Sequence, residues 1–586
     1  MSKLNIDQKS IKQLFADKKA DFLIPDYQRP YAWGEKECQT LWDDLFTFAF
    51  PEDDFGNPNP DRFNLDEEYY LGPIVTFKNS ITGQQEVIDG QQRLTTLMLL
   101  LRAFYSNFGK MNADNIRKLK EAIEQCIWKL NEDDEVLNDQ LKIASDVATD
   151  NDKDEFLYIL KKGETMPNMK SVYAQNYIFF QKKIEQYKSD YPEYYSRLPK
   201  RIIENCILLP IEAESQDTAL RIFSTLNDRG KPLSDADIFK AQFYKYFSSC
   251  GKKDYFIQQW KLLEEKCERI FQPIVGTPMD DLFTRYMYYE RAKMGIKSST
   301  TEALRRFYER DSYALLKKDV TFDNLMNLAD FWNDVDLQNN ERFSDEVLRR
   351  LYVLNYAPNG MWTYFVSVYY MSNKRMDNTL DDDRFIEFLN KITGFIWGYA
   401  IFHPGVNALR TPVFAEMVNL VNGNDITFND FKFDEPQLET AIRSYIYSNN
   451  RAITKSMLTW WAFNDSKQEV LPLDTIIETE HIYATNRNAK EHTLSDDRLV
   501  ESLGNKAILE KRINIRASDY RFCDKKKYYE GFTMNNGKVK EGTKVVELLE
   551  MAKTQSDFVE SDILNRYDAI VKAFLQYLAN NDLLMK

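Results

Sequence analysis

The chain has 586 residues, 43% of them hydrophobic and 29% charged, which predicts a globular protein of two or three domains. A net charge of -14 excludes a surface built throughout for nucleic-acid binding, but it is compatible with one local basic site. Residues 1–24 lack the apolar segment of a secretion signal and no long charge-free apolar run follows, so we expect a cytoplasmic protein that neither enters nor crosses a membrane.

The N-terminal part alternates short strands with helices. "DFLIPDYQRPYAW" is predicted to be extended, because Pro25 and Pro30 each move the residue before them out of the helical region. The predicted elements, in order, are this extended segment at 21–33, a helix at 35–50, a polar acidic loop at 51–68 and two hairpin strands at 69–77 and 85–89.

The stretch "EVIDGQQRLTTLMLLLRAF" (86–104) predicts a strand that stops at a glycine and leads at once into a helix buried nearly all round. One interpretation is structural, with Asp89 and Gln92 forming a capping box. The other is an anion site. Arg93 lies in the first helical turn, where the helix dipole disfavours a cation unless an anion such as phosphate lies beside it. Asp89 beside a phosphate would then need a shared magnesium ion.

A second polar segment supports the anion site. Gln28 and Arg29 lie between two prolines, and Tyr27, Tyr31 and Trp33 surround them. An arginine in a rigid loop offers a fork for phosphate, and the rings offer stacking faces for a base. The alternative is a surface loop with a hydrophobic anchor.

The following elements are predicted from the hydrophobic spacing. They are helices over 111–205, including the acidic "NEDDEVLNDQ" at 131–140, a strand at 207–211, helices at 218–226 and 235–247 around a turn, mostly helical and aromatic-rich structure over 250–465, and short strands mixed with helices from 470.

Four blocks, "IPDYQRPYAW", "YYLGPIV", "VIDGQQRLTTL" and "IFSTLNDRGKPLSDADIFK", resemble in this order the DUF262 domain over residues 8–250. This is a ParB-related nucleotide-binding module of the GmrSD and SspE classes of anti-phage restriction proteins. The resemblance implies a nucleoside triphosphate site, for GTP or another NTP, with Asn227 and Asp237 in an accompanying motif. An alternative for that motif is that Asn227 ends one helix and Asp237 helps to cap the next. The residues implied to line the site are Gln28, Arg29, Asp89, Gln91, Gln92 and Arg93.

The C-terminal part contains a second polar constellation. Glu480 and His481 end a short β-branched run, and Asn505 and Asn514 follow within a segment, 505–544, that has 11 Lys and Arg against 5 Asp and Glu. A metal-dependent nuclease needs a base for water and oxygen ligands for a hard cation, and an imidazole and these carboxylate and amide groups meet those needs. A basic cluster alone is more typical of a solvated helix face.

"EHI…LGN…IN…KKKYY" resembles the DUF1524 domain, an HNH-type ββα-metal nuclease, over residues 400–586. The resemblance implies His481 as general base, Asn505 as the structural asparagine, and Glu480 and Asn514 beside the metal ion. Lys526 and Tyr528 would contact backbone phosphate. One departure is that Tyr483-Ala484 replaces the proline that often follows the histidine.

We therefore predict an α+β, mostly helical multidomain chain, with an N-terminal ParB-like mixed domain at 1–250, a helical connector at 251–400 and a C-terminal ββα-metal (HNH) nuclease domain at 401–586. The predicted function is a nucleotide-regulated, modification-dependent restriction DNA endonuclease with NTPase activity. Mg²⁺ or Mn²⁺ and a nucleoside triphosphate are the expected cofactors, and modified phage DNA is the expected substrate. The alternatives are an RNA-cleaving abortive-infection nuclease and a nucleotide-gated DNA-binding protein with a silent nuclease site. A homo-oligomer is compatible with the sequence.

Overall fold

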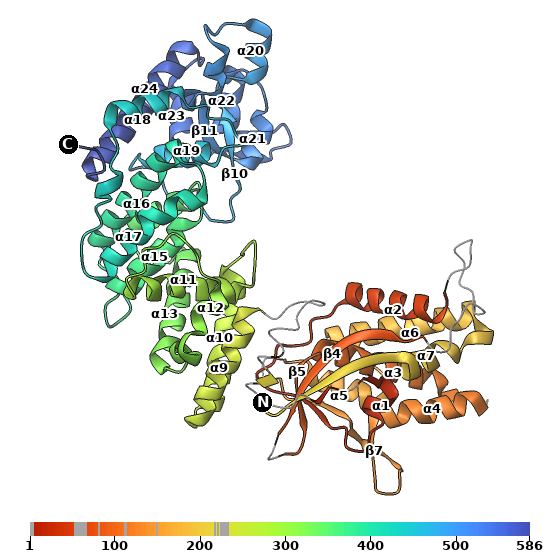
Figure 1. The fold of residues 1–586 in the computed structure, drawn as a ribbon. Helices are drawn as coiled ribbons and strands as arrows, with labels where there is room; N and C mark the ends of the chain where they lie inside the picture. The colour runs from red at the N-terminus through yellow and green to blue at the C-terminus, as the bar shows by residue number, and fades with distance from the viewer. Residues whose placement is uncertain are drawn as a thin grey trace. The chain divides into compact units, whose positions relative to one another are not determined.

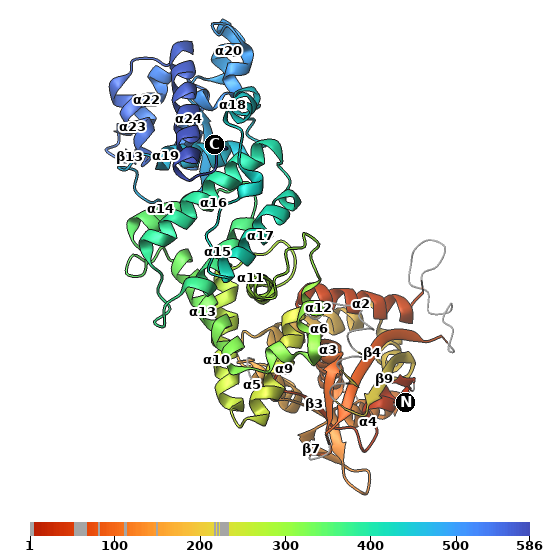
Figure 2. The ribbon, with the colours of Figure 1, turned by 60° about the vertical axis from the view of Figure 1, so that its left-hand side comes forward.

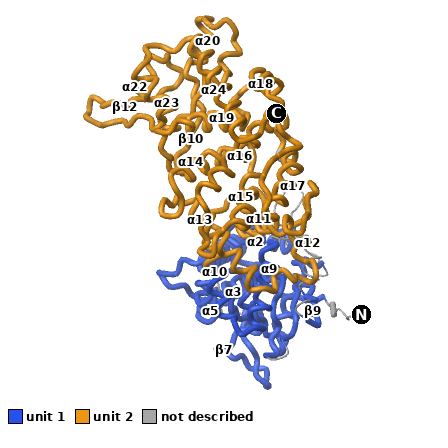
Figure 3. The backbone as a smooth tube through the Cα atoms, turned by 90° about the vertical axis from the view of Figure 1, so that its left-hand side faces the viewer, with its two compact units in different colours: residues 1–261 blue, residues 262–586 orange. Residues whose placement is uncertain are grey.

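The structure, a computed structural model, describes residues 5–6, 8–51, 67–79, 82–110, 114–147, 150–215, 218–219, 222 and 234–586. The chain forms two compact units, residues 1–261 and 262–586, which Figure 3 draws in different colours. Helices predominate and mixed sheets accompany them, so the predicted α+β multidomain class is confirmed.

The first unit is built on a mixed sheet. In its described part the strands are β1 (Asn5–Ile6), β2 (Lys9–Ser10), β3 (Phe22–Ile24), β4 (Tyr69–Lys78), β5 (Gln85–Asp89), β8 (Ile143–Ser145) and β9 (Cys206–Ala213). They pair in the order β1-β9-β4-β5-β3-β8, and β2 also pairs with β9. The hairpin β4–β5 is antiparallel, as predicted, whereas β3 lies parallel to β5 and β9 lies parallel to β4.

The two faces of this sheet have different cores. Successive side chains of a strand point to opposite faces, so Val87 of β5 joins the larger core and Ile88 joins a smaller one with Ala241. The larger core is formed with helices that Figure 1 shows beside the sheet. These are α1 (Ile11–Phe15), α2 (Glu35–Ala49), α3 (Gln91–Asn107), α4 (Asp114–Ile127), α5 (Lys153–Lys162), α6 (Val172–Asp190) and α7 (Arg197–Asn205), while α9 (Asp235–Ser249) supplies Ala241.

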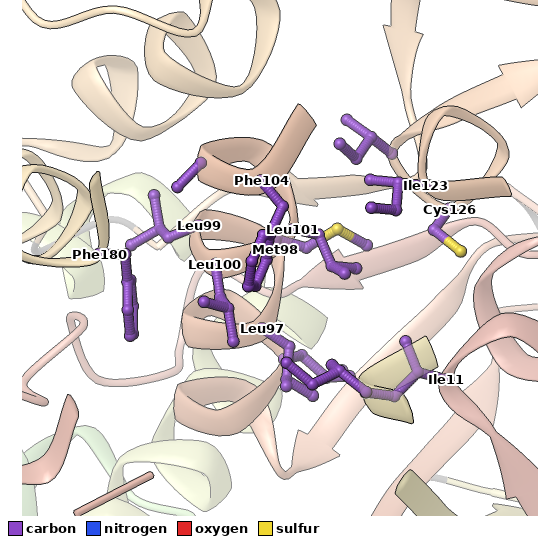
Figure 4. Close-up of a cluster of buried hydrophobic side chains, with 14 of the residues drawn as sticks. Ile11, Leu97, Met98, Leu99, Leu100, Leu101, Phe104, Ile123, Cys126 and Phe180 are labelled. Carbon is purple, nitrogen blue, oxygen red and sulfur yellow. The ribbon is translucent and has the colours of Figure 1, made fainter. Parts of the chain in front are cut away.

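Helix α3 is the centre of the larger core. Every side chain from Leu94 to Phe104 is buried, which confirms the predicted all-round burial. Figure 4 shows Leu97 to Leu101 on this helix, with Ile11, Ile123 and Phe180 from other helices around it. The polar first turn of α3 is therefore held by a rigid support.

The second unit is helical apart from short strands at its C-terminal end, as Figure 2 shows. Helix α10 (Lys253–Ile270) crosses the boundary between the units. The later helices are α11 (Pro278–Lys293), α12 (Leu304–Tyr308), α13 (Asp319–Asp336), α14 (Asp345–Leu354), α15 (Met361–Asn373), α16 (Asp382–Phe402), α17 (Arg410–Val421), α18 (Glu435–Ser444), α19 (Ala452–Phe463), α20 (Thr485–Glu491), α21 (Lys511–Ala517), α22 (Phe522–Glu530), α23 (Val546–Thr554) and α24 (Glu560–Asn580). The strands are β10 (Ile477–His481), β11 (Lys506–Glu510), β12 (Gly531–Thr533) and β13 (Val539–Glu541).

The prediction of helices throughout 111–205 is wrong in one place. The acidic stretch belongs to a hairpin of β6 (Trp128–Leu130) and β7 (Val136–Leu141), and β8 follows it. The turn forms because the Asn131 side chain accepts hydrogen bonds from the backbone N–H groups of Asp133 and Glu135. The helices at 35–50 and 235–247 and the strand at 207–211 are confirmed, whereas most of the predicted loop at 51–68 and helix at 218–226 lies outside the described residues.

Candidate functional site

The structure brings the two polar segments of the first unit together. Because β3 and β5 are parallel neighbours, the chain leaves both strands at the same edge of the sheet. Gln28 and Arg29 follow β3, and Asp89 to Arg93 follow β5. Gln91 Nε2 lies 3.5 Å from the carbonyl oxygen of Arg29, so residues about 60 apart in sequence form one polar rim above the sheet.

The predicted capping box of Asp89 and Gln92 is absent. Gly90, not Asp89, precedes the first turn of α3, with φ 89°, and no side chain caps the helix. The Gln92 side chain instead accepts a hydrogen bond from the Ala32 N–H (2.7 Å) and donates one to the Pro30 carbonyl (3.1 Å). The capping box is therefore wrong, and Gln92 instead ties the loop after β3 to α3.

Arg93 lies against the backbone of β4. Its guanidinium donates a hydrogen bond to the Pro73 carbonyl at 2.8 Å. A Cβ added at Gly72, where φ is +119°, would lie 2.9 Å from the guanidinium carbon, so glycine is needed there for the close approach. Burial raises the pKa of Asp89, and the Gly90 N–H, Arg93 and Arg29 act in the opposite direction.

The residues of this rim differ in burial, and the buried ones have a different role from the partly exposed ones. Gln28 and Gln92 are buried, and the amide of Gln28 lies 3.2 Å from the carbonyl oxygen of Ile88, so these two side chains hold backbone. Arg29, Asp89 and Arg93 are partly exposed and can reach a ligand. The buried Gln91 Oε1 has no hydrogen-bond partner among the described residues.

The accompanying motif is only partly described. Asn227 lies outside the described residues. Ser234 and Asp237 form a reciprocal capping box at the start of α9, which confirms the structural alternative for Asp237.

In the second unit, β10 pairs antiparallel with β11, and α21 follows β11 directly. His481 is the last residue of β10, Asn505 immediately precedes β11, and Asn514 lies within α21. Asn505 is fully buried. Its Oδ1 accepts from the Tyr483 N–H (2.7 Å), and its Nδ2 donates to the carbonyls of Tyr483 (3.1 Å) and Val500 (3.0 Å). This amide pins the loop that follows His481.

The imidazole of His481 faces an acid that the sequence analysis missed. Its Nε2 lies 3.2 Å from Oε1 of Glu501, whose Oε2 accepts a hydrogen bond from the buried Lys506 at 2.6 Å. Burial lowers the pKa of His481 and the charge of Lys506 lowers it further, while Glu501 opposes both. The ring is therefore predominantly neutral near pH 7, as a general base must be.

The two expected metal ligands, Glu480 and Asn514, pair with different residues in the structure. The Glu480 carboxylate is buried and accepts from Lys525 (2.7 Å) and Tyr529 (2.5 Å). Asn514 instead donates to Oε2 of Glu478 at 2.8 Å. Glu478 and Glu480 lie two residues apart on one strand and so share a face, which the pattern "IETEH" shows in the sequence.

The expected phosphate contacts lie on α22. Lys526 donates to the Gln555 carbonyl at 2.6 Å, so its ammonium is occupied by backbone. Tyr528 lies in a surface row of rings with Tyr520 and Phe532, and the exposed Lys527 lies over its ring. Lys527 is thus more accessible to a phosphate than the neighbouring Lys526.

The described residues lack two further features. They contain no group of three or more His, Cys, Asp and Glu side chains placed to hold a metal ion. None of the helices within the described ranges is long and apolar enough to span a bilayer.

Comparison with known families identifies the class. A model of the N-terminal domain of the GmrSD restriction endonuclease matches residues 11–244, and a model of the C-terminal domain of these enzymes matches residues 432–573. No curated protein matches the chain. Each match covers one of the two sites, so the chain is a restriction endonuclease with both domains on one polypeptide. It belongs to the GmrSD restriction endonuclease family, which confirms the resemblance seen in the sequence.

Proposed function

We propose that this protein is a nucleotide-regulated, modification-dependent DNA endonuclease of HNH type. The observation that carries this proposal is the β10–β11–α21 unit, in which a strand-end histidine, a buried loop-pinning asparagine and a helix asparagine occur in this order. The family membership supports cleavage of DNA.

His481 is the general base in this proposal. The neutral imidazole takes a proton from water as the water oxygen bonds to phosphorus. The bond from phosphorus to the leaving sugar oxygen breaks, and that oxygen takes a proton from solvent. Asn505 keeps the loop after β10 in place, so the ring stays where strand pairing puts it.

The side-chain oxygen atoms of Asn514 and Glu478 suit a hard cation. Mg²⁺ binds through one or two carboxylates and keeps several waters. Asn514 and Glu478 would hold it, since their side chains already touch, and Glu480 could join only after Lys525 and Tyr529 release it. When bound, the ion would stabilise the negative charge that develops on the phosphate.

The N-terminal rim is proposed to bind and hydrolyse a nucleoside triphosphate, GTP or another. Arg29 and Arg93 would contact phosphate, and Asp89 would share a magnesium ion with it. Their partial exposure and the clamp made by Gln92 support this assignment.

The test is cleavage of modified and plain phage DNA with Mg²⁺, with and without each triphosphate, alongside matched RNA. We expect cutting of modified DNA that depends on nucleotide and is lost in His481→Ala. Glu478→Ala should raise the Mg²⁺ concentration needed for half-maximal cutting. Equal cutting by wild type and His481→Ala would overturn the assignment of the base. Cutting of RNA alone would favour the abortive-infection alternative.

A further inference from the structure

The ring of His481 is held on one side only. Nε2 lies 3.2 Å from Glu501 Oε1, whereas Nδ1 has no hydrogen-bond partner among the described residues. The histidine side chain is 19% exposed. One nitrogen is thus engaged by a carboxylate, and the other is left for a reacting molecule.

Glu501 is fixed in turn by Lys506. The ammonium of Lys506 has no exposed surface and donates to Glu501 Oε2 (2.6 Å), the Tyr447 carbonyl (2.6 Å) and Asn449 Oδ1 (2.8 Å). An ammonium has three N–H donors, and each is used here. Lys506 therefore holds the Glu501 carboxylate in place by its Oε2 atom, and Oε1 faces the imidazole of His481.

Strand register explains why an acid is needed at this point. His481 and Lys506 are directly paired across β10 and β11, so their side chains lie on the same face. An ammonium can only donate hydrogen bonds, so Lys506 alone could not accept one from the ring N–H of His481 and fix the ring orientation. Glu501, at the end of the short helix Asp497–Glu501, bridges the two.

The carboxylate also selects the tautomer. A neutral imidazole has one N–H and one lone pair, and an ionised carboxylate can only accept. The proton must then lie on Nε2, which leaves the lone pair of Nδ1 free to accept a proton from water.

We propose that Glu501, anchored by Lys506, is a positioning residue that fixes the ring orientation and tautomer of His481 and so presents Nδ1 to the attacking water. This inference rests on the proposed function, in which His481 is the general base.

The isosteric variant Glu501→Gln gives the sharpest test. Lys506 can only donate, so the glutamine must turn its oxygen toward Lys506 and its NH₂ group toward His481. That NH₂ group favours the opposite tautomer, with the proton on Nδ1. If Glu501 only filled space beside His481, Glu501→Gln should cut like wild type. If Glu501 selects the tautomer of His481, Glu501→Gln should cut more slowly.

We expect Glu501→Gln to lower kcat for cutting modified DNA by about 10–100-fold, the scale found when a hydrogen-bond partner that orients a metal-bound histidine is removed. DNA affinity should stay within about twofold, because Glu501 does not contact substrate in this proposal. Glu501→Ala should also lower kcat. Glu491→Gln is the matched control and should cut like wild type, since Glu491 lies in the same unit but pairs with Arg487 and Arg521 and not with His481.

The outcomes separate the two proposals. If His481→Ala is inactive and Glu501→Gln cuts within twofold of wild type, the positioning role is overturned while the base stands. If His481→Ala cuts like wild type, the assignment of His481 as the base fails, and the positioning role of Glu501 fails with it. A measurement independent of turnover is ¹⁵N NMR of histidine-labelled protein, which has only three histidines. We expect the His481 proton on Nε2 in wild type and on Nδ1 in Glu501→Gln, and an unchanged tautomer would overturn the inference.

Discussion

Among single residues, Arg93 gives the most direct test of the proposed triphosphate site. It lies at the start of α3, pressed against Gly72 and hydrogen-bonded to Pro73, with its partly exposed guanidinium beside Asp89. We expect Arg93→Ala to weaken triphosphate binding by about 1.5–3 kcal/mol, the scale of one charge-assisted hydrogen bond. Isothermal titration calorimetry measures this loss.

The control for that change is Arg117→Ala, because Arg117 is an exposed arginine of the same unit on α4. It should bind the triphosphate like wild type. Unchanged affinity in Arg93→Ala would show that the guanidinium serves only to hold the strand β4.

The protonation of His481 gives a pH prediction. Its pKa in the folded protein is lowered by burial and by Lys506, so it lies below the ordinary value of about 6.5. The neutral base therefore persists as pH falls through 6.5, and cutting should decline only at lower pH. The stability of the folded protein should change in the same direction. Above the unfolded pKa of His481 the ring is neutral in both states, and as pH falls from there through the lower folded pKa, protonation favours the unfolded state and the free energy of unfolding decreases.

The check is the pH profile of kcat/KM at saturating Mg²⁺, whose acid limb should have its midpoint below about 6.5. Glu491→Gln should show the same midpoint as wild type. A midpoint above 6.5 would mean that the charged imidazole is favoured in the free enzyme, contrary to its burial.

At the scale of secondary-structure elements, one buried ion pair joins β10 to α22. The side chains of Lys525 and Glu480 are 1% and 4% exposed, and their charges lie 2.7 Å apart. Removing one partner leaves a buried charge, so Lys525→Met should destabilise the second unit by about 3–5 kcal/mol. Thermal unfolding followed by circular dichroism measures the change.

Two further variants make this result interpretable. Lys527→Met changes an exposed lysine of the same helix and should melt like wild type. Replacing both Glu480 and Lys525 by methionine removes both charges and should recover much of the lost stability. A double variant no more stable than Lys525→Met would show that packing, not charge, is lost.

Elements with strong hydrophobic spacing could be predicted from sequence, and elements set by side-chain hydrogen bonds could not. The stripe of α3 and the antiparallel hairpin of β4 and β5 confirm the first point. The β6–β7 hairpin was missed because its turn depends on one asparagine side chain. The capping box at Asp89 failed because Gly90 adopts a positive φ there.

The residues of the candidate nuclease site also divide into those that could be predicted from the sequence and those that could not. Motif residues that fall next to strand ends, such as His481 and Asn505, were found from the sequence and lie at one end of the β10–β11 pair. Glu501 and Lys525 were missed, because they reach β10 from 20 and 45 residues away and only the fold brings them there. Glu478 could have been found from its alternation with Glu480.

At the scale of the whole molecule, the two compact units predict two unfolding steps. The larger core of the first unit is made of residues from Ile11 to Leu208, so it does not depend on the second unit for its apolar contacts. Differential scanning calorimetry should therefore show two transitions. A triphosphate at about 100 times its Kd should stabilise the first unit by about 2.7 kcal/mol.

The control is Arg93→Ala, which should keep both transitions but reduce the shift caused by nucleotide by about half or more. A single transition that moves as a whole with nucleotide would show instead that the units unfold together. The domain division at 1–250, 251–400 and 401–586 remains a prediction, and calorimetry of the full chain bears on its first boundary.

The complete burial of α3 has a consequence for how the first unit responds to its ligand. Side chains from Leu94 to Phe104 are inaccessible, so deuterium reaches the amides beneath them only when the entire unit opens. Asp89 and Arg93, which are partly exposed on either side of the buried residues 90–92, are not shielded in this way. Mass-spectrometric deuterium uptake should thus show protection by nucleotide in a peptide ending near residue 93, against a background from the rest of the helix that barely exchanges.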